Sequence, residues 1–185
     1  MPSLETDYLV IGAGATGLAF TDALVGASDA RVLLVDRRAA PGGHWNDAYP
    51  YVRLHQPSAY YGVNSLVLGH DGVDETGVNA GGYERATAPE VRDYFARALR
   101  DVLLPTGRVE YRPLVDYVGD GESRHAVAAR LTGEVTEVSV RRRVVDARFN
   151  EPSIPFSHAL PFGVDDATVI APNDLVRTSG ASGYT

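Results

Sequence analysis

The sequence predicts an α/β fold, with a parallel sheet covered by helices and a small antiparallel β-meander. Two observations support this. Residues 7–36 read as strand, tight turn, helix and second strand, the order of a βαβ unit. Residues 126–140 alternate between apolar and polar on both sides of a Thr-Gly turn, which is typical of an antiparallel hairpin. With 185 residues, of which 44% are hydrophobic, we expect one domain spanning residues 1–185.

The first strand leads directly into a glycine-rich turn. Tyr8–Ile11 is a continuous apolar run, as in a parallel strand that is covered on both faces. Gly12, Gly14 and Gly17 follow with the spacing G-x-G-x-x-G. The first glycine allows the tight turn, the second removes a side chain from the path of a diphosphate, and the third lets the helix pack closely on the strand. This arrangement predicts a Rossmann-like dinucleotide-binding domain.

The helix after this turn can bind an anion without a cationic side chain. Backbone N–H groups of its first turn, at Ala15 and Thr16, have no partner within the helix, and the helix dipole is positive at this end. This matters because the chain contains no lysine. Asp36 ends the second strand, where a carboxylate can accept hydrogen bonds from ribose hydroxyls. Asp36 favours FAD or NAD, although Arg37 and Arg38 directly after it could contact a 2′-phosphate.

The composition excludes several other classes of protein. Without cysteine the chain has no disulfide, catalytic thiolate or redox-active cysteine pair, and without lysine it has no Walker lysine or Schiff base. The net charge of -7 argues against nucleic acid as a partner. Apolar runs are too short for a membrane span, the five histidines lack metal-ligand spacing, and the N-terminus does not read as a signal peptide. We therefore expect a cytoplasmic protein without a metal.

Residues 39–65 form a loop that is too long and too aromatic for a simple connection. Gly43 allows close approach of the backbone. Trp45 is either a flat stacking surface or a core aromatic residue. His55 and Gln56 supply hydrogen-bonding groups, although a loop histidine is often bonded only to its neighbours.

These motifs together resemble class B flavin monooxygenases, of the Baeyer–Villiger and N-hydroxylating types. The members of that family carry G-G-x-W followed by Y-P, where this chain has G-G-H-W from Gly42 and Y-P-Y-V-R-L-H-Q-P from Tyr49. In the family the first dinucleotide fold holds FAD, the G-G-x-W loop lies along the flavin, and a second fold holds NADPH. The resemblance implies an FAD-binding set of Gly12, Gly14, Ala15, Thr16, Gly17, Asp36, Arg37, Gly43, His44, Trp45, His55, Gln56 and Val115, with His55 or Gln56 as the catalytic candidates at the flavin face.

The middle of the chain is predicted to be largely structural. Residues 66–85 are polar and glycine-rich and read as a surface excursion or lid. Thr87 and Glu90 form a capping box at the start of a helix, whose apolar face recurs at helical spacing until Gly107 ends it. Val109–Val118 is then expected to be a third parallel strand.

Two later stretches extend the resemblance. Val115 corresponds to the family's valine whose backbone meets adenine, with Pro113 in place of the family's threonine. Residues 144–147 are expected to form a further parallel strand, followed by Arg148 where relatives have Ala-Thr-Gly. A short strand is predicted at 168–170.

The resemblance implies the FAD-binding part of a monooxygenase. FAD would be reduced by NADPH or NADH, form a C4a-peroxyflavin and pass oxygen to a small organic substrate. No second G-x-G-x-x-G occurs in the 185 residues. We therefore expect the nicotinamide-binding half on a second polypeptide in a hetero-oligomer, unless it has been lost or lies outside this sequence. Two alternatives remain: a non-redox module in which FAD is structural, and an NAD-dependent dehydrogenase half, in which G-G-H-W would have no purpose.

Overall fold

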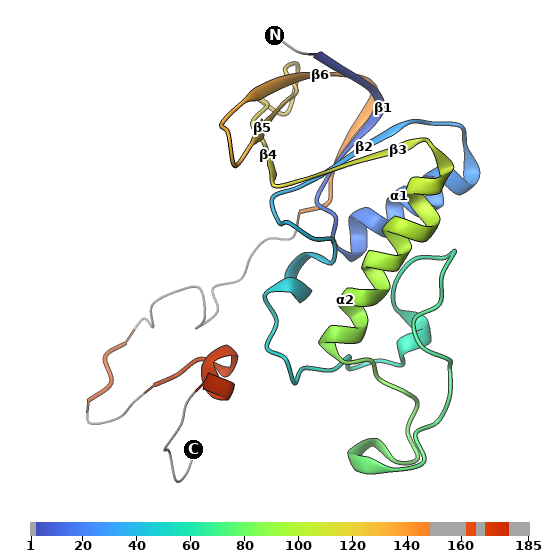
Figure 1. Cartoon of the computed structure of the whole chain (residues 1–185), viewed down its shortest axis with the longest axis vertical. Coiled ribbons are helices and arrows are strands. Elements are labelled where there is room, and N and C mark those ends of the chain that lie inside the picture. Colours follow the sequence, from blue (N-terminus) through green and yellow to red (C-terminus); the bar gives the residue numbers. More distant parts are fainter. Residues whose placement is uncertain (1–2, 149–161, 166–168, 178–185) are drawn as a thin grey trace.

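A computed structural model describes residues 3–148, 162–165 and 169–177, and it contains a six-stranded sheet of mixed direction (Figure 1). The strand order is β3-β2-β1-β6-β5-β4. Pairs β1–β2, β2–β3 and β1–β6 are parallel, whereas β4–β5 and β5–β6 are antiparallel. The strands are β1 (Ser3–Ile11), β2 (Val32–Asp36), β3 (Val109–Pro113), β4 (Val115–Tyr117), β5 (Ala126–Ala129) and β6 (Val135–Asp146). The predicted parallel sheet with an antiparallel meander is confirmed.

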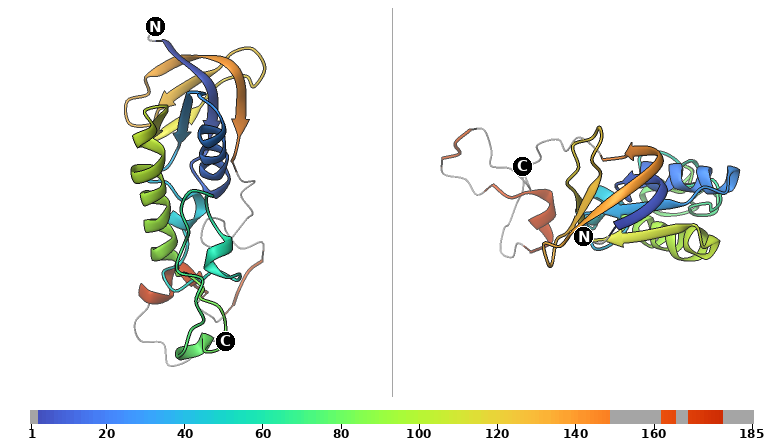
Figure 2. Two further views of the ribbon diagram at one scale, coloured as in Figure 1. Left: turned by 90° about the vertical axis from the view of Figure 1, so that its right-hand side faces the viewer. Right: turned by 90° about the horizontal axis from the view of Figure 1, so that it is seen from above.

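Strand β6 joins the meander to the parallel sheet. Its first residues pair antiparallel with β5, and its later residues run parallel to β1, where Ile11 is opposite Asp146. The predicted second strand of the hairpin and the predicted strand at 144–147 are therefore one long strand. This strand lies within the sheet and curves as it passes from β5 to β1 (Figure 2). Strand β1 begins at Ser3, well before the apolar run, because its first half also pairs with β6.

The sheet separates two hydrophobic cores. Side chains alternate between the faces of a strand, so Leu9 and Leu33 face the meander while Val10 and Leu34 face the helices. All four are at most 2% exposed. The strands are therefore buried on both faces, as their continuous apolar runs predict.

Helix α1 (Ala15–Ala27) lies against the sheet through a different stripe from the predicted one. From the apolar and small residues of this helix one expects a buried stripe of Leu18, Ala19, Ala23, Leu24 and Val25. Only Leu18 and Val25 of these are fully buried, whereas Ala23 is exposed. The buried face also contains Gly17, Thr21 and Asp22, because the close contact at Gly17 sets the rotation of the helix.

The second helix agrees with its predicted capping signals. Helix α2 (Ala88–Arg97) begins at a complete capping box of Thr87 and Glu90, and it continues through a π-helical turn, Ala98–Leu103, and a 3-10 turn, Leu104–Thr106. Gly107, with φ of 67°, ends it. Tyr94 and Phe95 on its inner face are fully buried.

The predicted strand Val109–Val118 is wrong as a single element. Strand β3 ends at Pro113, opposite Asp36, and Leu114 then adopts a left-handed conformation with φ of 55°. Val115 starts β4, which pairs antiparallel with β5 at the other edge of the sheet. The left-handed residue turns the chain out of the parallel ladder, so a continuous strand cannot form.

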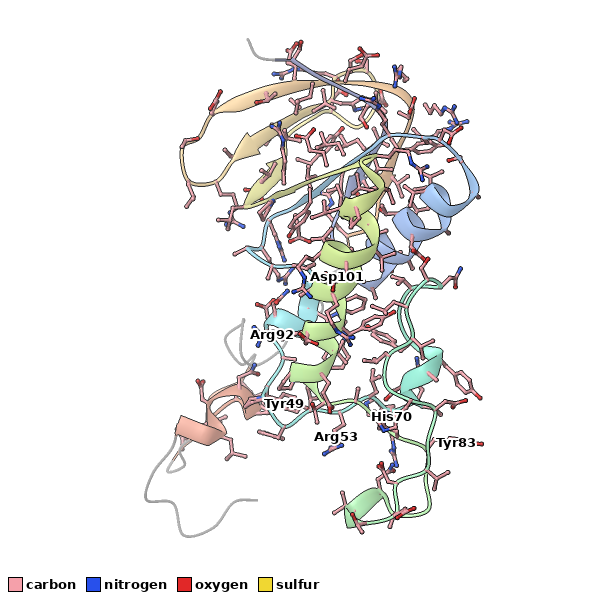
Figure 3. All side chains as sticks on the ribbon, turned by 45° about the vertical axis from the view of Figure 1, so that its right-hand side comes forward. Tyr49, Arg53, His70, Tyr83, Arg92 and Asp101 are labelled. Carbon is pink, nitrogen blue, oxygen red and sulfur yellow. The ribbon has the colours of Figure 1, made fainter. Side chains whose placement is uncertain are left out.

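Residues 66–85, which we call the arm, project away from the rest of the chain. In Figure 3 they lie below helix α2. An isolated bridge joins Val73 and Tyr83, and Tyr83 points away from the rest of the chain. At the root of the arm, the Tyr94 hydroxyl accepts a hydrogen bond from the Val63 N–H at 2.7 Å and donates one to the Leu66 carbonyl at 2.6 Å. The root is therefore tied to the core by side-chain hydrogen bonds.

Residues 169–177 approach the loop that follows β2. The 3-10 helix Pro172–Arg177 contacts this loop through the Asn173 amide, which donates to the Asp47 carbonyl at 2.7 Å. The predicted strand at 168–170 is not formed at 169–170, and residue 168 lies outside the described residues. In the described part of the chain, no helix is long and apolar enough to cross a membrane, and no group of three or more His, Asp or Glu could hold a metal ion.

Candidate dinucleotide site

The glycine turn has the geometry that the motif predicts. Gly12 has φ of 106°, and a Cβ atom there would lie 3.2 Å from the Ala147 carbonyl oxygen. A Cβ atom at Gly17 would lie 1.8 Å from the Gly12 carbonyl oxygen, a distance that no side chain can occupy. Helix α1 follows Gly14 without a side-chain cap and without an acidic residue in its first turn. Its N-terminus is thus available to an anion.

The G-G-H-W loop lies directly against this turn. The Gly42 N–H donates to the Ala13 carbonyl at 2.8 Å. Gly42 and Gly43 have φ of 114° and 56°, and a Cβ atom at Gly43 would lie 3.0 Å from the Gly14 Cα. The two glycine motifs are therefore in direct contact here, and the contact involves only backbone atoms. The close approach predicted for Gly43 is an approach to the glycine turn itself.

Asp36 fixes the turn from the other side. Its carboxylate is almost fully buried, accepts the Ala13 N–H at 2.6 Å through Oδ2, and accepts the Arg38 N–H at 2.7 Å through Oδ1. Since each carboxylate oxygen can accept more than one hydrogen bond, contact with a ribose remains compatible with these bonds. The contact itself stays a prediction.

The two arginines after Asp36 differ in their contacts. The Arg38 guanidinium forms an ion pair with Asp47, with Nε to Oδ2 at 2.9 Å. Asp47 caps the 3-10 helix Gly43–Asn46, where its N–H donates to the His44 carbonyl. Arg37 is exposed, and its predicted role at the cofactor stays untested.

A cavity of about 350 Å³ brings together four of the predicted loop residues, namely His44, Trp45, His55 and Gln56. Its wall also includes Tyr49, Arg53 and Tyr61, together with Ala48, Val52 and Leu54. Tyr49 and Arg53 lie on the loop beside the N-terminal end of α2 (Figure 3). His55 and Gln56 are exposed, so a ligand can reach both.

Trp45 is a core residue that also forms part of the wall of this cavity. Only 7% of it is exposed, and its Nε1–H donates to the Tyr61 hydroxyl at 2.7 Å. Tyr61 in turn packs edge-on against Phe95 of α2. Burial raises the pKa of the Tyr61 phenol, and the hydrogen bond from Trp45 partly opposes this. Of the two interpretations of Trp45, the core aromatic fits and an open stacking surface does not.

His44 is held toward its neutral form. Partial burial lowers the pKa of its imidazole, and the positive charge of Arg38 lowers it further, while Asp47 acts in the opposite direction. The ring lies beside Trp45, with 5.4 Å between ring centroids. A neutral imidazole has one nitrogen that can accept a hydrogen bond.

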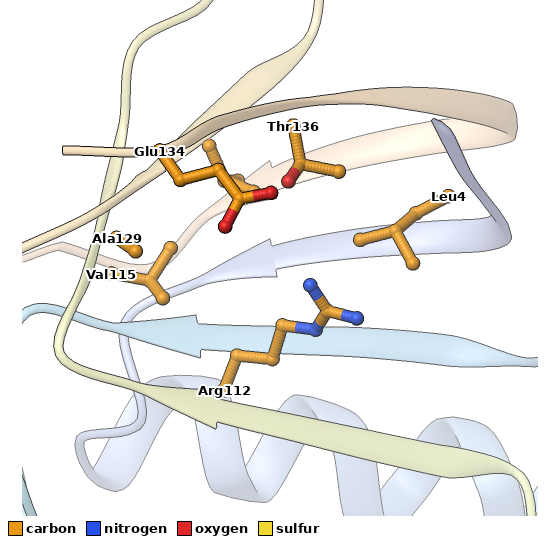
Figure 4. Close-up of a pocket in the computed structure, with 7 residues that line it drawn as sticks. Leu4, Arg112, Val115, Ala129, Glu134 and Thr136 are labelled. Carbon is orange, nitrogen blue, oxygen red and sulfur yellow. The ribbon is translucent and has the colours of Figure 1, made fainter. Parts of the chain in front are cut away.

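Val115 lies apart from the other predicted residues. Its side chain belongs to the core under the meander and lines a separate cavity of about 210 Å³, together with Arg112 and Glu134 (Figure 4). The Leu114 N–H just before it donates to the Arg38 carbonyl at 3.1 Å, so the backbone here is near the end of β2. The predicted contact of the Val115 backbone with adenine stays a prediction.

Sequence reasoning missed Asp47 and Tyr61, which hold the site in place. Asp47 belongs to the run G-G-H-W-N-D, where an acid nine residues after Arg38 gave a weak signal for an ion pair. Tyr61 is 16 residues beyond Trp45, and no local pattern predicts contact over such a distance.

A glycine turn between a parallel strand and a helix, with an acid closing the next strand, defines a dinucleotide-binding domain of the Rossmann type. Residues 10–72 match the family model of the NAD(P)-binding Rossmann-like domain. The matched stretch begins in β1, includes α1 and β2, and ends in the arm.

Solved structures with a similar fold include several flavin monooxygenases. A flavin-containing monooxygenase from Stenotrophomonas maltophilia is 24% identical, with a TM-score of 0.53 over 80% of this chain and 38% of its own. A cyclohexanone monooxygenase is 21% identical, with a TM-score of 0.51 over 78% of this chain and 27% of its own. The predicted resemblance to flavin monooxygenases is confirmed at the level of the fold.

The curated relatives are longer proteins. An uncharacterized protein of Mycobacterium tuberculosis is 48% identical over 183 residues, which is 98% of this chain and 33% of the relative, and one from Mycobacterium bovis matches equally. The chain spans about a third of the length of the curated relatives it matches.

Proposed function

We propose that this chain is the FAD-binding part of a flavin-dependent oxidoreductase of the monooxygenase type. The observation that carries the proposal is the N-terminus of α1 at Gly14, which has no side-chain cap and no acidic residue in its first turn, and which the G-G-H-W loop contacts through the backbone of Gly43. A diphosphate can bind at the N–H groups of this first turn because no side chain at position 14 or 43 stands in front of them.

The residues around this helix N-terminus match the rest of such a cofactor. Backbone N–H groups of Ala15, Thr16 and Gly17 would hold the diphosphate, and Asp36 the ribose. The aromatic cavity beside His44 would take the ring system, since its volume of about 350 Å³ lies within the range of small-molecule sites. When bound, FAD supplies hydride acceptance and oxygen activation.

The protein itself would orient the cofactor and exclude water from it. Trp45 and Tyr61 close the inner wall of the cavity through their mutual hydrogen bond. Neutral His44 can accept a hydrogen bond from a ring N–H group. His55 and Gln56 on the open side are our candidates for hydrogen bonding to an oxygen atom of the substrate or cofactor, which makes them the catalytic candidates.

Reduction of the flavin needs a nicotinamide donor, which we propose is NADPH or NADH bound outside these 185 residues. Support comes from similar folds, since one neighbour is a steroid monooxygenase bound to NADP and another a complex with FAD and NADP. The curated relatives are about three times as long as the matched part, so the donor-binding half lies either further along one polypeptide or on a second polypeptide in a hetero-oligomer. The substrate would be a small organic molecule.

FAD titration of the purified protein tests the proposal. We expect uptake of one FAD per chain, and loss of uptake in Gly14→Val, whose side chain would stand at the N-terminus of α1 where the diphosphate binds, on a backbone with φ of -80° that accepts any residue. Gly26→Val in the same helix is the matched control, because nothing lies within 4 Å of a Cβ atom there. A protein that binds no FAD, alone or with its donor-binding half, would refute the proposal.

A second candidate is a non-redox module in which FAD has a structural role. Anaerobic addition of NADPH or NADH to the FAD-loaded protein distinguishes the two. Bleaching of the flavin in the presence of the donor-binding half supports the oxidoreductase. Failure of every combination to reduce the flavin supports the module.

A further inference from the structure

The ion pair between Arg38 and Asp47 determines which ribose the site can accept. In dinucleotide-binding domains of this type, the acid at the end of the second strand accepts bonds from a free 2′-hydroxyl, and an arginine close after it accommodates a 2′-phosphate. This chain has both kinds of residue, Asp36 and then Arg37 and Arg38. The sequence therefore does not decide between a free 2′-hydroxyl and a 2′-phosphate. The structure adds the contact that Arg38 makes with Asp47.

Arg38 stands where an arginine could reach the ribose. Its backbone N–H donates to Asp36 Oδ1 at 2.7 Å, so its Cα is next to the acid that we assign to the ribose. The side chain instead turns toward Asp47, with 2.9 Å between Nε and Oδ2 and a second contact from Nη2 to the same oxygen. The Arg38 side chain is only 22% exposed, so the guanidinium is held against the protein.

Asp47 is well placed to hold this arginine. Its N–H donates to the His44 carbonyl at 3.0 Å, and its own carbonyl accepts the Asn173 amide at 2.7 Å. These backbone contacts fix the residue at the end of the G-G-H-W turn independently of its side chain. The carboxylate is then left to pair with the Arg38 guanidinium, beside His44.

We propose that Asp47 is a positioning residue for specificity: it withdraws the Arg38 guanidinium from the ribose, so the site binds adenosine diphosphates with a free 2′-hydroxyl and rejects the 2′-phosphorylated form. The inference rests on the proposed dinucleotide function. The charges agree with it, because a 2′-phosphate beside Asp36 and Asp47 would meet two carboxylates while the Arg38 guanidinium stays on Asp47.

The test compares binding of ADP-ribose and 2′-phospho-ADP-ribose by calorimetry. We expect the wild type to prefer ADP-ribose. Asp47→Ala keeps both backbone contacts and removes the carboxylate that draws Arg38 away from the ribose, so its affinity for 2′-phospho-ADP-ribose should rise about tenfold, as one new charge-assisted contact would give, while that for ADP-ribose changes little. Adding Arg38→Ala to this variant should abolish the gain.

Asp93→Ala is the matched control, since it breaks an exposed Asp–Arg pair with Arg97 that lies on α2. It should leave the ratio of the two affinities unchanged. Asp47→Asn, which keeps the shape of the side chain, serves if Asp47→Ala folds poorly, and circular dichroism checks both.

Three results would overturn the proposal or its basis. An unchanged ratio in both Asp47 variants removes the role of Asp47, and a wild type that prefers 2′-phospho-ADP-ribose reverses the assigned specificity. A gain that survives Arg38→Ala would assign the contact to another cation. If the wild type binds neither ADP-ribose nor FAD, the proposed dinucleotide function itself fails, which is a different outcome from the first three.

Discussion

The Asp36 carboxylate holds the glycine turn by accepting the backbone N–H of Ala13 at 2.6 Å. The same residue Ala13 accepts the N–H of Gly42 through its carbonyl. Three segments that are separate in sequence, the glycine turn, the end of β2 and the G-G-H-W loop, thus meet at one residue. These bonds fix the glycine turn and the G-G-H-W loop relative to each other.

Asp36→Asn should destabilise the turn although it preserves the shape of the side chain. Asp36 accepts backbone N–H groups on both oxygens, so asparagine must place its NH₂ group against one of them. A buried unpaired donor costs about 1–3 kcal/mol, which urea unfolding would measure. Asp146→Asn, at the exposed end of β6, should cost less than about 0.5 kcal/mol. Equal losses in both variants would refute a special role for Asp36.

Gly17→Ala should damage the fold, whereas Gly26→Ala should not. A Cβ atom at position 17 would lie 1.8 Å from the Gly12 carbonyl oxygen, so helix α1 would have to move away from β1 at a cost of roughly 1–3 kcal/mol or more. At position 26 nothing lies within 4 Å, and alanine should stabilise the helix by about 0.5–1 kcal/mol. Thermal unfolding of both variants measures the opposite signs. A stable Gly17→Ala protein that still takes up FAD would contradict the close contact.

The sequence predicted the elements that depend on local chemistry. The strand–glycine–helix unit, the capping box of Thr87 and Glu90, and the hairpin from Ala126 each follow from residues within a few positions of one another. The break between β3 and β4 was missed because a left-handed leucine has no signature in sequence, and Leu114 adopts this conformation through its place in the fold.

The site was predicted less completely than the fold. The motifs identified His44, Trp45, His55 and Gln56, which the structure does bring to one cavity. They could not show that Trp45 is buried, nor which partner Arg38 takes, because both depend on side chains brought close only by folding. Contacts of this kind decide specificity, and they have no local pattern.

Tyr94, which is buried, and Tyr111, which is partly buried with a buried hydroxyl, should respond oppositely to loss of the hydroxyl. Tyr94→Phe removes the hydroxyl that bonds Val63 and Leu66 at the root of the arm, and should cost about 1–3 kcal/mol. The Tyr111 hydroxyl is the buried side-chain group that lacks a hydrogen-bond partner among the described residues, so Tyr111→Phe should be neutral or stabilising. Urea unfolding compares the two, and hydrogen exchange at 63–66 should accelerate only in Tyr94→Phe. Similar losses of stability would contradict the assignment of the root.

The His44 imidazole should make the protein less stable as the pH falls below neutral. Its pKa in the folded state lies below the ordinary value of 6.5, because of partial burial and the charge of Arg38. As the pH drops through 6.5, the unfolded chain therefore binds a proton at this position that the folded chain does not yet bind, and unfolding becomes more favourable. His44→Gln should lose this part of the pH dependence, with a smaller drop in unfolding free energy between about pH 7 and pH 5 than the wild type shows.

NMR titration of the His44 ring gives the pKa directly. Asp47→Asn should lower the His44 pKa further by removing the charge that opposes Arg38, whereas Asp93→Asn should not. A His44 pKa at or above 6.5 in the folded protein would refute the arrangement of Arg38, Asp47 and His44 described above.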